Sequence, residues 1–205
     1  NNSYDDVLTL VEAIGEYWED ILEDRFSNRM YGYPFTKNDY SIFEQFNELF
    51  KQEYVGYRFI DGLISPISNE IEIDTIQESL DGEHSAVTLH IRKAHSLLAN
   101  REHPDYENSI KESISSVEAM CEIVTGVRGK EATLGNMLKK LEQKGVVIHS
   151  ALKSAFNILY GYTSDANGIR HAGDIGGKAS TFEEAKFMLV SCSAFVNYLI
   201  AVSAK

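Results

Sequence analysis

The amino-acid sequence predicts a mainly α-helical protein in which a small helical module with one β-hairpin precedes a larger helical bundle. Apolar residues recur at helical spacing along most of the 205 residues. The one clear β signal lies at residues 57–67, where two short apolar runs flank Asp61-Gly62. Hydrophobic residues make up 43% of the chain, which suffices for an ordinary buried core.

Two amphipathic helices are expected in the first 50 residues. Ser3 is suited to cap the first helix, and its apolar positions fall on one stripe, so we expect it to pack by that face. The stripe consists of Val7, Leu10, Val11, Ile14, Trp18, Ile21 and Leu22. Gly32 and Pro34 predict a break, after which apolar residues between 42 and 50 predict the second helix.

The hairpin and a short helix are expected next. Asp61-Gly62 suits the positive φ angles of a tight two-residue turn. Pro66 has no amide proton to donate, so the hairpin is expected to be small and to lie at an edge. Asn69 and Glu72 have the spacing of a capping box, which predicts a helix through Leu80.

A domain boundary is predicted at Asp81-Gly82, between an acidic module of residues 1–82 and a helical bundle of residues 83–205. Residues 1–83 hold 19 acidic and five basic side chains, whereas residues 84–205 hold 12 acidic and 14 basic ones. The net charge of −12 argues against a generic nucleic-acid coat protein. The acidic module either keeps the protein soluble or binds a protein partner.

The second module is expected to be entirely helical. Helices are predicted at about 85–99, from Pro104 to Gly126, around 134–141 before Gly145, around 152–160, and after the capping-box pair Thr181 and Glu184. Residues 187–204 carry no charge, which suits either a membrane span or a buried core helix. Interspersed serine, asparagine and tyrosine favour the core helix over a membrane segment. Because no secretory signal pattern is visible in the first residues, a cytoplasmic protein is expected.

Few residues suggest chemistry. Cys121 and Cys192 lie in apolar helical patterns and are expected to be core thiols in a reducing compartment. Glycine-rich phosphate loops and metal-ligand spacings are absent from the sequence, so neither a cofactor nor a metal is expected. His90 and His95 are five residues apart, a poor match to one helical face, and are interpreted as ordinary helix residues.

The polar stretch 164–172 between two apolar helices is the strongest candidate site. His171 can exchange a proton near neutral pH, and Arg170 can stabilise a phosphoryl transition state. Asp165 or Asn167 would position the histidine, and Ser164 would contact substrate. Alternatively, Asp165 caps a helix and Arg170 pairs with a carboxylate.

Asn108 and Lys111 are further candidates on the predicted helix that ends at Gly126. They lie opposite its apolar stripe, together with Ser115, Glu118 and Glu122. This side is either an ordinary solvated surface with minor side-chain pairing or a place where substrate binds.

Several segments resemble HEPN-domain proteins of the bacterial abortive-infection, AbiJ-like family. The resemblance rests on residues 101–114, 117–119, 160–165, 168–172 and 182–192, and on Gly168-Ile169-Arg170-His171 in particular. It covers about the last 120 residues, and a weaker one at 56–59 and 66–67 extends to the amino-terminal module.

The resemblance implies a helical bundle that forms a homodimer and, in active members, cuts RNA without a metal. Those members carry an arginine, usually a polar residue, and then a histidine after four to six intervening residues. In this sequence Ser164 and Asp165 stand at the first two positions, and Arg170 directly precedes His171. Adjacent helical residues point about 100° apart, so a two-fold dimer would have to bring Arg170 of one subunit to His171 of the other.

Three functions therefore stay open at this point. The first is a metal-independent ribonuclease acting in antiphage defence. The second is a sensor that binds RNA or a nucleotide without cleaving it. The third is a scaffold whose acidic module binds a protein partner, such as an antitoxin.

Overall fold

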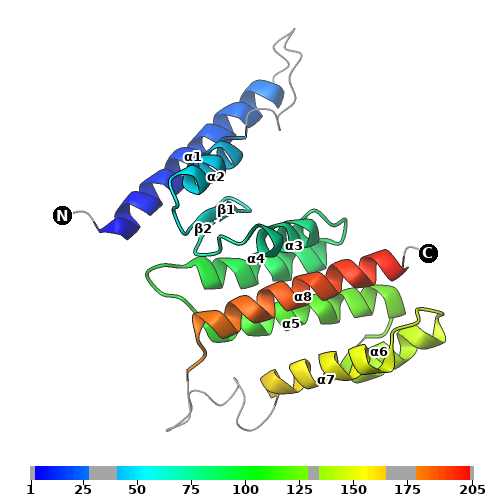
Figure 1. Cartoon of the computed structure of the whole chain (residues 1–205). Helices are drawn as coiled ribbons and strands as arrows, with labels where there is room; N and C mark the ends of the chain where they lie inside the picture. Colours follow the sequence, from blue (N-terminus) through cyan, green and yellow to red (C-terminus); the bar gives the residue numbers. More distant parts are fainter. Residues whose placement is uncertain (1–2, 28–40, 129–133, 165–178, 204–205) are drawn as a thin grey trace. The chain divides into compact units, whose positions relative to one another are not determined.

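The computed structural model describes residues 3–27, 41–128, 134–164 and 179–203, with residues 23–27 and 163–164 described as backbone only. The chain forms two compact units, residues 1–73 and 74–205 (Figure 1). The fold is mainly helical with one two-stranded hairpin among the described residues, as predicted. The units divide within helix α3, whereas Asp81-Gly82 marks the end of that helix.

The first unit contains α1 (Tyr4–Ser27), α2 (Ile42–Gln52), β1 (Arg58–Ile60), β2 (Leu63–Ser65) and the start of α3 (Glu70–Leu80). Ser3 caps α1 as predicted, because its hydroxyl accepts from the Asp6 amide at 3.2 Å and its own amide donates to the Asp6 carboxylate at 2.9 Å. At α3, the Asn69 side chain accepts from the Glu72 amide at 3.2 Å.

The hairpin has the predicted turn. Asp61 and Gly62 take φ angles of 47° and 81°, and Ile60 pairs with Leu63 across them. Side chains form hydrogen bonds with backbone groups on the outer edge of each strand. The Asn47 amide group accepts from the Phe59 backbone N–H at 2.6 Å and donates to the Phe59 carbonyl at 3.0 Å. Glu12 accepts from the Ile64 N–H at 2.6 Å.

The predicted packing face of α1 is wrong. Most of the predicted stripe is exposed: Val7 by 47%, Leu10 by 61%, Ile14 by 47% and Trp18 by 44%. The helix packs instead along a line that includes Leu8, Val11, Glu12, Gly15, Glu19 and Leu22. This line mixes apolar and polar residues, because Glu12 and Glu19 accept backbone hydrogen bonds from β2 and the start of α2. Gly15 lies against the Phe43 ring.

The second unit contains α4 (Ser85–Ala99), α5 (Tyr106–Thr125), α6 (Leu134–Gln143), α7 (Ser150–Ser164) and α8 (Phe182–Ser203). Helices α4 and α8 pack on α5, and α6 and α7 lie on the same helix (Figure 1). Gly126 and Gly145 adopt positive φ at the ends of α5 and α6, as expected. Pro104 was expected in the first turn of α5 but precedes Asp105, whose side chain caps the helix.

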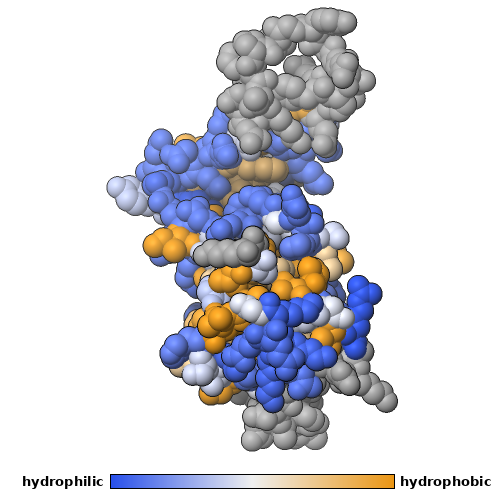
Figure 2. Space-filling model, turned by 90° about the vertical axis from the view of Figure 1, so that its right-hand side faces the viewer, coloured by the Kyte–Doolittle hydropathy of each residue, from blue (hydrophilic) through white to orange (hydrophobic). Residues whose placement is uncertain are grey.

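Helix α8 is the one helix in the described part of the chain that is long and apolar enough to cross a membrane. Of its most apolar stretch, 44% is buried inside the protein. Buried Met188, Leu189, Val196 and Leu199 favour its interpretation as a core helix. On the face drawn in Figure 2, hydrophobic side chains form several groups separated by hydrophilic ones.

Both cysteines are buried free thiols, as predicted. Burial raises the pKa of Cys192 to about 12, and burial with the nearby Glu118 charge does the same for Cys121. Because the thiolate is the reactive form, we expect negligible labelling by a disulfide reagent at pH 8 until the protein is unfolded. Two thiols should then react. Labelling of the folded protein at the rate of the unfolded chain would contradict this burial.

Candidate functional site

The centre of the predicted site lies outside the described residues. Asp165, Asn167, Arg170 and His171 are not among the described residues. Ser164 is the last residue of α7, and only its backbone is described. Asn108 and Lys111 are described and lie on α5. The structure describes the helices α7 and α8 that precede and follow this segment in the sequence, and the roles of Arg170 and His171 stay predictions.

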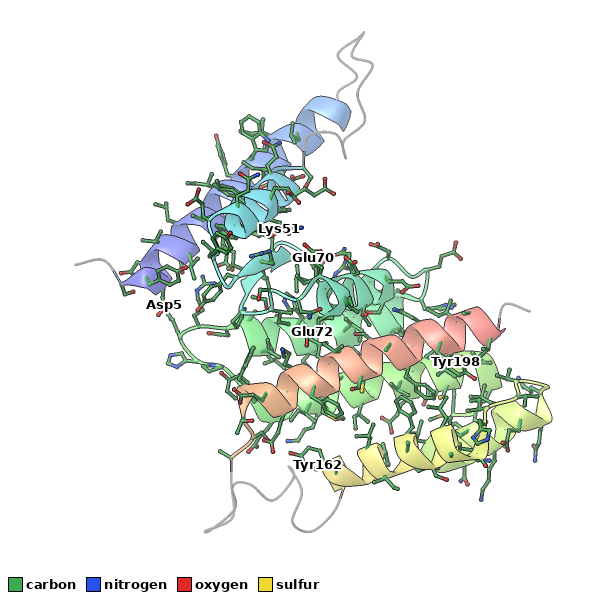
Figure 3. The ribbon with its side chains drawn as sticks, in the orientation of Figure 1. Asp5, Lys51, Glu70, Glu72, Tyr162 and Tyr198 are labelled. Atoms are coloured by element: carbon green, nitrogen blue, oxygen red, sulfur yellow. The ribbon has the colours of Figure 1, made fainter. Side chains whose placement is uncertain are left out.

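The two helices that bracket this segment are joined by a hydrogen bond. Tyr162 lies near the end of α7 (Figure 3), and its hydroxyl donates to the Glu184 carboxylate on α8. Burial and the Glu184 charge and hydrogen bond raise the pKa of Tyr162 above its usual value. Glu184 also accepts from the Thr181 amide at 2.8 Å, while the Thr181 hydroxyl accepts from the Glu184 amide at 3.2 Å. The predicted capping box is thus confirmed. Its Glu184 also holds the end of α7 through Tyr162.

The start of α5 lies at the same end of the bundle. The Tyr106 ring meets the Phe182 ring edge to face, with centroids 6.1 Å apart. The start of α5, the end of α7 and the start of α8 therefore lie at the same end of the bundle.

Asn108 and Lys111 belong to a small polar network at this end. Asp105 accepts from the Asn108 backbone amide at 3.0 Å and from its side-chain amide at 2.6 Å. The Lys111 ammonium donates to the Asn108 side-chain oxygen at 3.4 Å. Asn108 is thus engaged in capping α5, whereas the long Lys111 side chain is held only by a weak contact. Their predicted contact with substrate stays a prediction.

A second polar cluster, not anticipated from the sequence, joins α4 to α5. His90 Nδ1 lies 2.7 Å from Glu112 Oε2, and Lys93 donates to the other oxygen of the same carboxylate. The Glu112 side chain is only 15% exposed. The three residues are 19 and 22 positions apart across two helices, so no short-range pattern could reveal them.

The cluster of His90, Lys93 and Glu112, called the clasp below, links α4 to α5, and its contribution to stability depends on pH. Burial alone would raise the pKa of Glu112, but the hydrogen bonds from Lys93 and His90 outweigh it and hold the pKa below its usual value. The stability contributed by the carboxylate is therefore complete above the usual glutamate pKa, and it is lost as the pH falls through the lowered folded-state pKa.

The capping box gives a testable difference between two neighbouring glutamates. Glu184→Ala and Glu183→Ala remove the same charge from the first turn of α8, but only Glu184 accepts from the Thr181 amide. We expect Glu184→Ala to lower the free energy of unfolding by about 1 kcal/mol more than Glu183→Ala, measured by urea denaturation. Equal losses in the two variants would show that neither the capping box nor the Tyr162 hydrogen bond of Glu184 contributes to stability.

Among the described residues, no group of three histidine, cysteine, aspartate or glutamate side chains is placed to hold a metal ion. The polar groups that the structure does bring together are the convergent helix ends and the clasp on α4 and α5.

The comparisons with known proteins concern the amino-terminal part. Residues 1–81 match the family model described as AbiJ N-terminal domain 4. Comparison with curated proteins and with solved structures gave no match. The matched range includes the hairpin and all of α3, and it contains the weaker of the two resemblances noted in the sequence. The first 81 residues are therefore similar to an AbiJ amino-terminal domain, which supports an AbiJ-like assignment.

Proposed function

We propose that this is an abortive-infection defence protein whose second unit is a HEPN-like bundle that cleaves RNA without a metal ion. Two independent sequence signals support the proposal. Residues 1–81 match an AbiJ amino-terminal domain, and residues 101–192 contain the segments that resemble the HEPN domain of the same kind of protein.

The observation that carries the proposal is that one end of each of three helices, α5, α7 and α8, lies at the same end of the bundle, and that α7 and α8 directly flank residues 165–178 in the sequence. The Tyr162–Glu184 hydrogen bond holds the ends of α7 and α8 together at the base of that segment. The Tyr106–Phe182 contact brings the start of α5, and with it Lys111, to the same end. A polar segment gains catalytic precision when rigid helices fix both of its ends.

The proposed chemistry is attack of an RNA 2′-hydroxyl on the adjacent phosphorus. The new O–P bond forms a 2′,3′-cyclic phosphate, and the 5′-oxygen leaves with a proton. His171 acts as the general acid or base, and Arg170 stabilises the negative charge that develops on the phosphate. Asp165 or Asn167 positions the imidazole. A two-fold dimer would let Arg170 of one subunit act beside His171 of the other.

The test is an assay of the purified full chain on a mixture of structured and single-stranded RNAs in EDTA. Cleavage with 2′,3′-cyclic phosphate ends is expected. Intact RNA, in an assay where an added control ribonuclease is active, would contradict the proposal.

A second candidate function is RNA binding without cleavage. It is favoured by one observation: Arg170 directly precedes His171, so the two side chains of one subunit diverge if that stretch is helical. In this case affinity for RNA should fall as salt rises, with no product formed. Affinity that does not change between 50 and 200 mM salt, roughly the range over which phosphate contacts weaken, would count against RNA binding.

A further inference from the structure

The first unit contains an open pocket of about 590 Å³ that none of the functions considered so far uses. One wall runs from the end of α2 to the start of β1, with Lys51, Tyr54 and Arg58. The opposite wall is the start of α3, with Asn69, Glu70 and Ile71. The volume is within the usual range for small-molecule sites, about 300–1,000 Å³.

Tyr54 occupies a backbone position that normally belongs to glycine. The Val55 amide donates to the Phe50 carbonyl at 2.8 Å and the Tyr54 amide to the Lys51 carbonyl at 3.3 Å, which is the Schellman pattern at a helix end. Tyr54 is its left-handed residue, with a φ of 56°, although Gly56 is only two positions away. The tyrosine side chain is 95% exposed, so no packing within the described part of the chain compensates for this strain.

The pocket also gathers cationic groups in a strongly acidic unit. Residues 1–73 contain 15 acidic and five basic side chains. The structure describes the side chains of two of these five, Lys51 and Arg58, and both line the pocket.

Arg58 is fixed in a position to receive an anion. Its side chain is buried, and one terminal nitrogen donates to the carbonyls of Val55 and Tyr57 at 2.6 and 2.7 Å. Within the described part of the chain, the other guanidinium nitrogens have no hydrogen-bond partner, and they are not among the atoms sealed from solvent. They therefore keep donors available at the pocket.

Lys51 is paired with Glu70 across the pocket (Figure 3). The Glu70 hydrogen bond and charge raise the pKa of Lys51, and the same bond lowers the pKa of Glu70. Both side chains are more than half exposed, so the pair is screened by water and readily exchanged. The Glu70 carboxylate thus binds the Lys51 ammonium group where the phosphate group of a ligand could bind in its place.

We infer that this pocket binds a small nucleoside phosphate, with the base stacked on Tyr54 and the phosphate held by Lys51 and Arg58. A tyrosine ring offers a stacking surface for any base, and a guanidinium group matches phosphate geometry. The ligand is a mononucleotide and not a nucleic acid, because a polymer would extend onto the acidic surface of the unit and be repelled.

The experiment measures binding to the full chain by calorimetry at low salt. The probes are AMP, GMP, CMP and UMP, with adenosine, inorganic phosphate and a single-stranded oligoribonucleotide as comparisons. At least one mononucleotide should bind at least about tenfold more tightly than adenosine or phosphate alone, because two contacts act together. Absence of mononucleotide binding, equal binding of phosphate alone, or tighter binding of the oligoribonucleotide would overturn the inference.

Variants locate the binding in this pocket. Lys51→Gln should weaken mononucleotide binding about tenfold or more, whereas Lys139→Gln, at an exposed position on α6, removes the same charge and should leave it unchanged. Glu70→Gln should tighten binding, because Lys51 no longer has to leave a carboxylate. Weaker binding in Glu70→Gln, or equal effects of Lys51→Gln and Lys139→Gln, would place the ligand elsewhere.

Tyr54→Gly separates a binding role from a structural one. Glycine removes the strain at this position, so the midpoint of thermal unfolding should rise by about 2–6 °C. Loss of the stacking ring should weaken mononucleotide binding about five- to 100-fold at the same time. Tyr54→Phe should bind as the natural protein does. Unchanged binding in Tyr54→Gly would remove the tyrosine from the site and overturn the inference.

Discussion

His171→Ala is expected to slow RNA cleavage by about 10²–10⁴-fold, the usual contribution of a general acid or base. The reason is that alanine cannot accept the 2′-hydroxyl proton or return one to the leaving oxygen. Initial rates should be measured in EDTA at pH 7, with 2′,3′-cyclic phosphate ends as the product. His103→Ala, which removes an exposed histidine of the same unit, is the matched control and should keep at least half of the rate.

If His171→Ala and His103→Ala cleave RNA equally fast, and both have the unfolding midpoint of the natural protein, then His171 takes no part in proton transfer. A His171→Ala variant with a lowered unfolding midpoint would need Arg170→Lys as a second test, because lysine keeps the charge but loses the planar guanidinium geometry.

Phe59→Ala should have the largest effect on stability, a loss of about 3–5 kcal/mol in the first unit. The Phe59 ring is 4% exposed and lies at the centre of an aromatic cluster. Its centroid is 4.9 Å from Phe43, 5.6 Å from Phe46 and 6.2 Å from Phe50. Alanine would leave a cavity that the surrounding rings cannot fill.

The single tryptophan of the chain, Trp18, lies on α1 and reports on this unit. Urea unfolding followed by its fluorescence should shift to a much lower midpoint in Phe59→Ala. Leu63→Ala changes a 36% exposed residue of the same hairpin and should cost less than about 1 kcal/mol. Equal midpoints for the two variants would contradict the central place of Phe59.

Features that depend on neighbouring residues could be predicted from the sequence. Asp61-Gly62 specifies its turn by its own backbone preferences, and Thr181 with Glu184 forms a capping box within one helical turn. Gly126 and Gly145 end their helices for the same local reason. These signals need no knowledge of what packs against them.

Features that depend on distant partners could not be predicted. The packed face of α1 contains Glu12, Gly15 and Glu19, whose roles follow from the hairpin and from α2, so the apolar stripe alone indicates the wrong face. The clasp between His90 and Glu112 joins residues 22 positions apart on two helices. Tyr54 takes the left-handed position although a glycine is nearby.

The candidate site likewise has one feature that the sequence predicts and one that it does not. The polar stretch with Arg170 and His171 stands out in the sequence by its contrast with the apolar helices around it. The hydrogen bond between Tyr162 and Glu184 at its base involves residues 22 positions apart, and the sequence gives no sign of it.

Two inactive variants, His171→Ala and Arg170→Ala, can be mixed, unfolded together and refolded to show whether the site is shared between subunits. If a dimer site combines Arg170 of one subunit with His171 of the other, each mixed dimer regains one complete site. About a quarter of the natural rate should then return, because half of the dimers are mixed and one of their two sites is complete. A mixture as inactive as either variant alone, with mixed dimers demonstrated, would contradict a site shared between subunits.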